Sequence, residues 1–118
     1  MKHIYFIILV IIITSCKSKM DDIIKKGYFN NCKKATVEQL VNNFFSNPKW
    51  ESFVSPDDDK YHLNVSGQIQ YDEKPAKVII QFEELENEEW QINAFTINGE
   101  PQEDEIILEL VSEMCNAK

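Results

Sequence analysis

The sequence predicts an α+β domain: a helix, a four-stranded antiparallel meander and a C-terminal helix, with both helices packed on one face of the sheet. Apolar residues recur at helical spacing after Thr36 and again after Glu105, whereas residues 61–71 and 76–85 alternate between apolar and polar side chains. A period of two is that of a strand with one buried face. Two apolar helical stripes need a surface to cover, and the buried face of the sheet supplies it.

The first helix is predicted to begin at Thr36. Thr36 and Gln39 fit the S/T-x-x-E/Q capping box, in which two side chains bind otherwise unpaired backbone amides. Pro48 ends the helix, because the residue before a proline is pushed out of the helical region. The apolar stripe, which we interpret as core, consists of Val37, Leu40, Val41, Phe44 and Phe45.

Four strands are expected next, at residues 50–54, 61–71, 76–85 and 90–97. In the last of them the apolar positions change parity after Ala94. This change predicts either a β-bulge near Ala94 or a strand end with two apolar faces.

A turn rich in aspartate, residues 57–59, follows the first strand and invites a calcium interpretation. An EF-hand loop counted from Asp57 would need glycine at its sixth position and glutamate at its twelfth. Those positions hold His62 and Gln68, so we interpret the segment as a solvated turn.

The C-terminal helix is predicted to follow a turn at residues 98–101, with Pro101 in its first turn. Three acids at residues 103–105 crowd its start, where the helix dipole favours negative charge. We therefore interpret them as dipole partners and not as metal ligands. The buried stripe consists of Ile106, Ile107, Leu110, Val111, Met114 and Cys115.

The N-terminus has the pattern of an export signal. Ten apolar residues, 4–13, follow a short basic start; a transmembrane helix needs about 20, so this run is too short to span. We predict a lipoprotein signal peptide at residues 1–15, a lipidated N-terminus and tether at 16–26 that begins to dock near Ile23, and a single domain at 27–118.

The run Ile13-Thr14-Ser15-Cys16 resembles the lipobox of bacterial lipoproteins. That resemblance implies that Cys16 is lipidated, becomes the first residue of the mature chain and attaches it to the membrane through acyl chains. In a bacterium with two membranes we expect the outer membrane, facing the periplasm, and otherwise the outer face of the plasma membrane. The alternative is an incidental thiol beside an ordinary cleavage site.

Export would place the two remaining cysteines, Cys32 and Cys115, in an oxidising compartment. They bracket nearly the whole domain, and a disulfide between them would stabilise it by roughly 4–5 kcal/mol in the chain-entropy model. The alternative is two free, buried thiols.

Charge is unevenly distributed along the chain. Residues 17–34 carry six lysines against two aspartates, a net charge of +4, and residues 35–118 carry five lysines against eighteen acids, a net charge of −13. This acidic body argues against a nucleic-acid partner. It would suit a periplasmic inhibitor or immunity protein directed at a basic enzyme or toxin.

The sequence offers little catalytic chemistry. His62 is the one histidine after the signal peptide, and no motif places a nucleophile beside it. We interpret it as a surface histidine. No C-x-x-C or H-E-x-x-H spacing occurs, and no glycine-rich phosphate loop. We therefore expect no enzyme, no metal and no small-molecule cofactor.

The polar face of the predicted sheet remains as the candidate interaction surface. An open, amide-rich face suits reversible contact with a protein partner in the envelope, although simple solvation explains each residue equally well. The residues are His62, Asn64, Ser66, Gln68, Gln70, Lys77, Ile79, Gln81, Gln91 and Asn93. The sequence thus predicts a non-enzymatic interaction or accessory module.

Two further segments carry a resemblance, residues 27–53 and residues 97–102. Within the first, Gly27-Tyr28-Phe29, Thr36-Val37 and residues 48–53 (Pro-Lys-Trp-Glu-Ser-Phe) fit a pattern G-x-L, T-V, P-x-W-x-S-F, with Phe29 in place of the leucine. The pattern resembles small bacterial secreted or lipid-anchored proteins with a domain of unknown function. It implies no specific activity.

Overall fold

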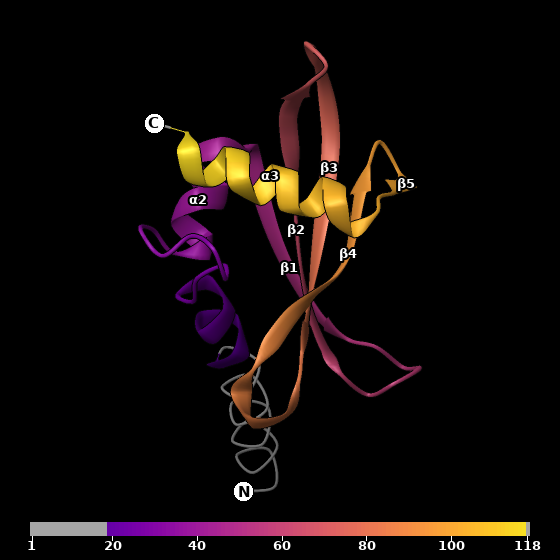
Figure 1. The fold of residues 1–118 in the computed structure, drawn as a ribbon. Coiled ribbons are helices and arrows are strands. Elements are labelled where there is room, and N and C mark those ends of the chain that lie inside the picture. Colours follow the sequence, from indigo (N-terminus) through magenta and orange to yellow (C-terminus); the bar gives the residue numbers. More distant parts are fainter. Residues whose placement is uncertain (1–18, 118) are drawn as a thin grey trace, which may run out of the picture.

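The alternating strands form one antiparallel meander in which neighbours in sequence are neighbours in the sheet, in the order β1-β2-β3-β4-β5. The computed structural model describes residues 19–117 (Figure 1). The strands are β1 (Ser46–Val54), β2 (Tyr61–Tyr71), β3 (Lys74–Glu84), β4 (Trp90–Ile97) and β5 (Glu100–Pro101). The helices α2 (Val37–Phe44) and α3 (Asp104–Asn116) flank the sheet in sequence, and a short 3-10 turn, η1 (Glu86–Glu88), joins β3 to β4. The predicted α+β class is confirmed, with one strand more than expected.

The first strand is longer than predicted. Helix α2 ends at Phe44, and the chain passes through extended Phe45 directly into β1 at Ser46. Pro48 lies inside this strand and not at the end of a helix. β1 is an edge strand, so a proline without an amide hydrogen can be accommodated there without the loss of a hydrogen bond in the centre of the sheet. The register with β2 shifts between Ser46 and Lys49, around this proline.

The fifth strand corrects the prediction for Pro101. Glu100 and Pro101 pair with Ile97 and Thr96 instead of starting the helix, which begins at Asp104 after the N-cap Glu103. Asn98 and Gly99 both have positive φ, +53° and +84°, as a two-residue hairpin turn requires. Asn-Gly is the strongest short hairpin signal, so the chain turns back as a strand before it can start a helix.

The parity change in β4 is a β-bulge. Gln81 pairs with Ala94 and the next residue, Phe82, pairs with Ile92, so Asn93 is the extra residue. The bulge brings Ile92 onto the same buried face as the residues that follow Ala94. Of the two predicted explanations, the bulge is therefore correct.

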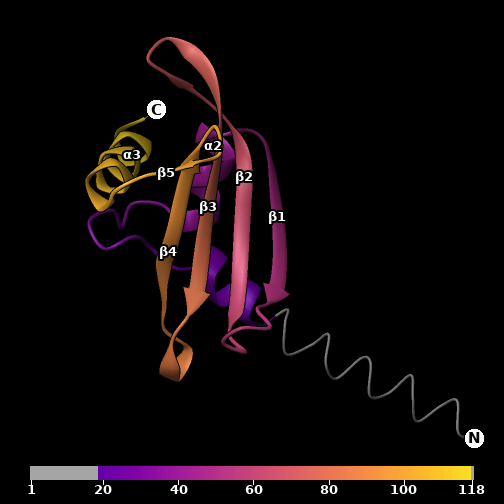
Figure 2. The same cartoon turned by 90° about the vertical axis from the view of Figure 1, so that its right-hand side faces the viewer.

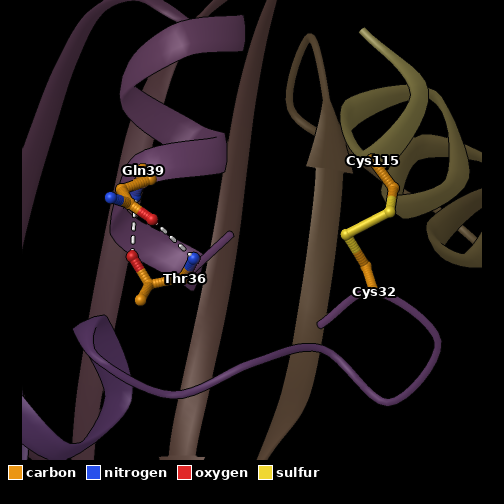
Figure 3. Close-up of a disulfide and its surroundings, with 4 residues drawn as sticks. All are labelled: Cys32, Thr36, Gln39 and Cys115. Carbon is orange, nitrogen blue, oxygen red and sulfur yellow. Dashed lines mark hydrogen bonds between the residues drawn. A yellow bond between two sulfur atoms is a disulfide. The ribbon is translucent and has the colours of Figure 1, made fainter. Parts of the chain in front are cut away.

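The start of α2 is the predicted capping box. The Thr36 backbone amide donates to Gln39 Oε1 over 2.9 Å, and the Gln39 amide donates to Thr36 Oγ1 over 3.2 Å (Figure 3). Two amides at the helix start are thus paired, as a capping box requires.

The folded part of the chain begins before residue 27, where we expected the domain to start. Residues 19–25 are helical, and Met20 and Ile24, one turn apart, are both buried. Figure 1 shows this indigo helix on the same side of the sheet as α2. The described part of the predicted tether therefore packs against the domain, because its apolar residues fall on one helical face.

The predicted disulfide between Cys32 and Cys115 is present, with the two Cα atoms 5.8 Å apart (Figure 3). It joins the segment before α2 to the last turn of α3 across 83 residues of sequence. Cysteine pairs of this kind persist in oxidising compartments, which indicates an extracytoplasmic domain.

The core lies between the helices and one face of the sheet, here called the inner face. Figure 2 looks onto the opposite face, here called the outer face, with α2 behind the strands. The largest fully buried side chains are Phe82, Ile24, Leu63, Ile80, Met114, Val37, Val41, Val65 and Val78. Among residues 19–117, no helix is both long and apolar enough to cross a membrane.

Candidate functional site

The outer face collects the residues that the alternation predicted. Strand register pairs Gln68 with Lys77, Ser66 with Ile79, and Asn64 with Gln81. From β4, the Asn93 side chain reaches the same face across the bulge and donates to Gln81 Oε1 over 2.7 Å. Gln91 pairs with Glu83. The outer face as an interaction site stays a prediction.

One end of the outer face is not solvated. His62 was expected to be a surface histidine, but only 4% of it is exposed, and only 7% of Glu83. The ring of Phe53, the cross-strand neighbour on β1, stacks on the His62 imidazole at 5.2 Å and 10°. Asp58 and Lys60, from the loop between β1 and β2, reach the two buried side chains. The loop and Phe53 together bury this end of the face.

We call Asp58, Lys60, His62 and Glu83 the polar cluster. Lys60 Nζ lies 3.2 Å from Glu83 Oε1, and His62 Nε2 lies 3.6 Å from Asp58 Oδ1. The Lys60 backbone amide donates to Asp58 Oδ1 over 3.0 Å, and this hydrogen bond holds the pKa of Asp58 below its ordinary value. Neither ring nitrogen of His62 makes a hydrogen bond with any residue that the structure describes.

The unpaired imidazole is energetically unusual. A buried polar group without a partner costs about 1–3 kcal/mol, and His62 buries two such atoms. Buried unpaired groups of this kind are uncommon, and each calls for an explanation. The polar cluster is therefore a candidate site in its own right.

A second candidate lies on the inner side, where the helices leave part of the sheet uncovered. A groove of about 650 Å³ opens between the segment before α2, the start of β4 and the start of α3. Its apolar lining consists of Tyr28, Phe29, Trp90, Ile92, Ile107 and Leu108. Its acidic lining consists of Glu88, Glu89 and Asp104. A smaller hollow of about 370 Å³ continues it along the disulfide.

Two large apolar side chains of this groove are open to solvent. Tyr28 is 48% exposed and Leu108 is 63% exposed, the highest value among the exposed large apolar residues of the described chain. Single exposed apolar residues are ordinary, but exposed apolar side chains gathered in a groove with a charged rim are typical of binding sites.

The Trp90 side chain, which lines the groove, is held by aromatic packing. The Trp90 ring meets Phe82 edge-on at 5.5 Å and Phe29 edge-on at 6.3 Å. Gly27 lies so close that a Cβ at this position would be 3.0 Å from Trp90 Cζ2. A Cβ here would press against the indole, so a glycine suits the close approach of residue 27 to Trp90.

Sequence reasoning missed both features for different reasons. Leu108 is visible in the sequence as an apolar residue off the buried stripe of α3, which is a usable signal. The pairing of His62 with Glu83 follows from the hairpin register, set by the turn at residues 72–73. The position of Asp58 beside His62 and Glu83 depends on the conformation of the loop between β1 and β2. A loop has no periodic sequence pattern from which its conformation could be predicted.

Comparisons of this chain with protein-family models, with curated proteins and with solved structures find no match. The lipobox and Cys16 lie outside the described residues. Function must therefore be inferred from the groove, the outer face and the polar cluster.

Proposed function

We propose that this protein is a non-enzymatic, lipid-anchored module of the bacterial cell envelope that binds another protein through the groove. The observation that carries the proposal is the exposure of Tyr28 and Leu108, which line the groove together with Trp90. Aromatic side chains such as tyrosine and tryptophan are enriched among the residues that contribute most to the free energy of binding at protein interfaces, and apolar neighbours exclude water from them.

The charge of the chain indicates the partner's chemistry. Glu88, Glu89 and Asp104 line the groove, and residues 35–118 carry a net charge of −13. A partner with an apolar side chain flanked by lysine or arginine would match both features, and complementary charge would also speed its association. Glu88 pairs with Lys19 at 2.8 Å, but both side chains are mostly exposed, so a basic partner can replace this ion pair at little cost.

The anchor follows from the lipobox resemblance. Lipid on Cys16 would hold the domain at a membrane surface, and the disulfide supports an oxidising compartment outside the cytoplasm. Where two membranes are present, the proposed location is the outer membrane, facing the periplasm; otherwise it is the outer face of the plasma membrane.

The outer face is the weaker candidate for the contact. An antiparallel sheet commonly keeps one polar face in water, so the outer face needs no partner to explain it. The exposed apolar side chains of the groove do call for a partner, because their exposure to water costs free energy.

Site-specific photo-crosslinking in the producing cells tests the proposal. A photoreactive amino acid at Leu108 should give an adduct with one protein, identified by mass spectrometry, and the same amino acid at Gln68 on the outer face should not. An adduct at position 68 alone would favour the outer face, and no adduct at either position would contradict the proposal.

The same experiment addresses the inhibitor or immunity function, which the acidic body favours. An adduct at position 108 that forms only when a basic enzyme or toxin is supplied would identify that function. An adduct with a resident envelope protein would identify an accessory module.

A further inference from the structure

We propose that Asp58, His62 and Glu83 bind a divalent transition-metal ion of the zinc class. One ligand atom from each residue lies within 4.8 Å of the others. Imidazole nitrogen and carboxylate oxygen are both zinc ligands, whereas a nitrogen ligand makes calcium or magnesium a poor fit.

The separation between the ligand atoms of His62 and Asp58 suits a shared ion. Zinc lies about 2.0–2.2 Å from nitrogen and oxygen ligands, so two ligands of a tetrahedral ion are about 3.4 Å apart. His62 Nε2 and Asp58 Oδ1 lie 3.6 Å apart, too far for a hydrogen bond and close to the separation that a shared ion imposes.

The burial of His62 is the independent observation that points to a ligand. The side chain is almost wholly enclosed, both ring nitrogens lack a hydrogen bond to any described residue, and Nε2 faces a carboxylate. The stacked ring of Phe53 fixes the plane of the imidazole. An imidazole held in one plane, with Nε2 free of hydrogen bonds and beside a carboxylate, can bind a metal ion through that nitrogen.

The ammonium group of Lys60 occupies the position beside Glu83 that the metal ion would take. Its ammonium lies 3.2 Å from Glu83 Oε1, and its side chain is 47% exposed. An arriving metal ion can displace this ammonium into solvent while the Lys60 backbone amide keeps Asp58 in position. The Lys60 ammonium thus competes with the metal ion for Glu83. The loop between β1 and β2 holds Asp58 where it can bind the ion.

Metal binding would join the loop between β1 and β2 to the hairpin of β2 and β3, because Asp58 lies in the loop and the other two ligands lie on the strands. Three protein ligands leave a coordination position for water or for a group from a partner.

The test is calorimetric titration of the full chain, purified in detergent and stripped with a chelator, with Zn²⁺ alone. One ion per chain should bind, and Co²⁺ should give the visible absorption of a nitrogen- and oxygen-ligated ion. His62→Ala should weaken zinc binding by more than the roughly 10–100-fold that loss of a supporting group costs a metal site. Asp58→Asn should weaken it by about 10-fold or more.

Two variants make the test specific. Asp59→Asn, the exposed neighbour of Asp58 in the same loop, is the matched control and should bind zinc as the wild type does. Lys60→Met should tighten binding by several-fold, because it removes the competing ammonium.

The proposal is overturned if the wild type does not bind zinc, or if His62→Ala binds it equally well. Should His62→Ala fail to fold, Asp58→Asn and Glu83→Gln decide, and unchanged binding in both would overturn the site. These outcomes are independent of the groove.

Discussion

The two faces of the sheet are built by different means. On the inner face, side chains from β2 and β3 such as Val65, Ile80 and Phe82 are buried by helices, and their spacing in the sequence is regular. On the outer face, His62 and Glu83 are buried by one loop and one aromatic ring. Burial that comes from packed elements can be read from periodicity, and burial that comes from a loop cannot.

The disulfide gives the largest expected effect, because it holds the helical layer on the inner face. Replacing both cysteines (Cys32→Ala with Cys115→Ala) should lower the free energy of unfolding by about 4–5 kcal/mol. Urea unfolding followed by circular dichroism measures the change. The wild type with added reductant is the control and should show a comparable loss; an unchanged midpoint in both would contradict the structural role.

Two neighbouring isoleucines on β3 compare the faces directly. Ile80 is buried on the inner face, and Ile79 lies half-buried on the outer face. Ile80→Ala should cost about 2–5 kcal/mol, because it leaves a cavity in the core, and Ile79→Ala should cost about 1 kcal/mol or less. Thermal unfolding of the two variants provides the measurement, and equal losses would mean that the outer face is covered in solution.

The capping box should contribute less. Thr36→Ala removes the acceptor for the Gln39 amide at the start of α2 and should cost about 1 kcal/mol of unfolding free energy. Thr36→Ser keeps the acceptor and serves as the control in the same urea titration. A serine variant as unstable as the alanine variant would show that the hydroxyl is not what stabilises the helix.

The smallest effect concerns the outer face and depends on pH. The pKa of Asp58 is lowered in the folded state, first by the hydrogen bond from the Lys60 amide. Its contribution to stability is therefore present above the unfolded value of about 3.9 and is lost as the pH falls through the lower folded value.

Asp58→Asn isolates this contribution, since asparagine can accept the same hydrogen bond without the charge. With a chelator present, the difference in unfolding free energy between the wild type and this variant should shrink as the pH falls from about 6 to about 2. A difference that stays constant over this range would rule out the charge of Asp58 as its source.

The features that the sequence predicted follow from local rules. The alternation in residues 61–71 predicted both ends of β2, and the capping box predicted the start of α2. The parity change predicted either a bulge near Ala94 or a strand end with two apolar faces, and the structure has the bulge, at Asn93. The disulfide followed from counting cysteines in a chain with a predicted export signal. Each rule needs only a few residues or a composition.

The features that it did not predict depend on competition between elements. Pro101 is compatible with the start of a helix, but the hairpin turn at Asn98-Gly99 brings it back alongside β4, where it pairs with Thr96. Pro48 fits a helix end, but an edge strand also accepts a proline. Residues 19–25 are too short to indicate a helix alone, and their burial depends on the surface that α2 and the sheet provide.

The two candidate sites repeat this contrast. The groove could be suspected from Leu108, which breaks the amphipathic pattern of α3. The polar cluster could not, because a histidine, two acids and a lysine become a site only when the loop after β1 closes over the strands.

The most direct test of the central claim is the equilibrium dissociation constant of the crosslinked partner for the wild type and two matched variants. Leu108→Lys places a cation in the groove, and Gln68→Lys makes a similar change on the outer face; both positions are exposed, so both variants should fold. We expect Leu108→Lys to weaken binding by about 30-fold, as loss of a central interface side chain does, and Gln68→Lys to leave it unchanged. Unchanged binding by Leu108→Lys, with a loss in Gln68→Lys, would contradict the account and place the interface on the outer face.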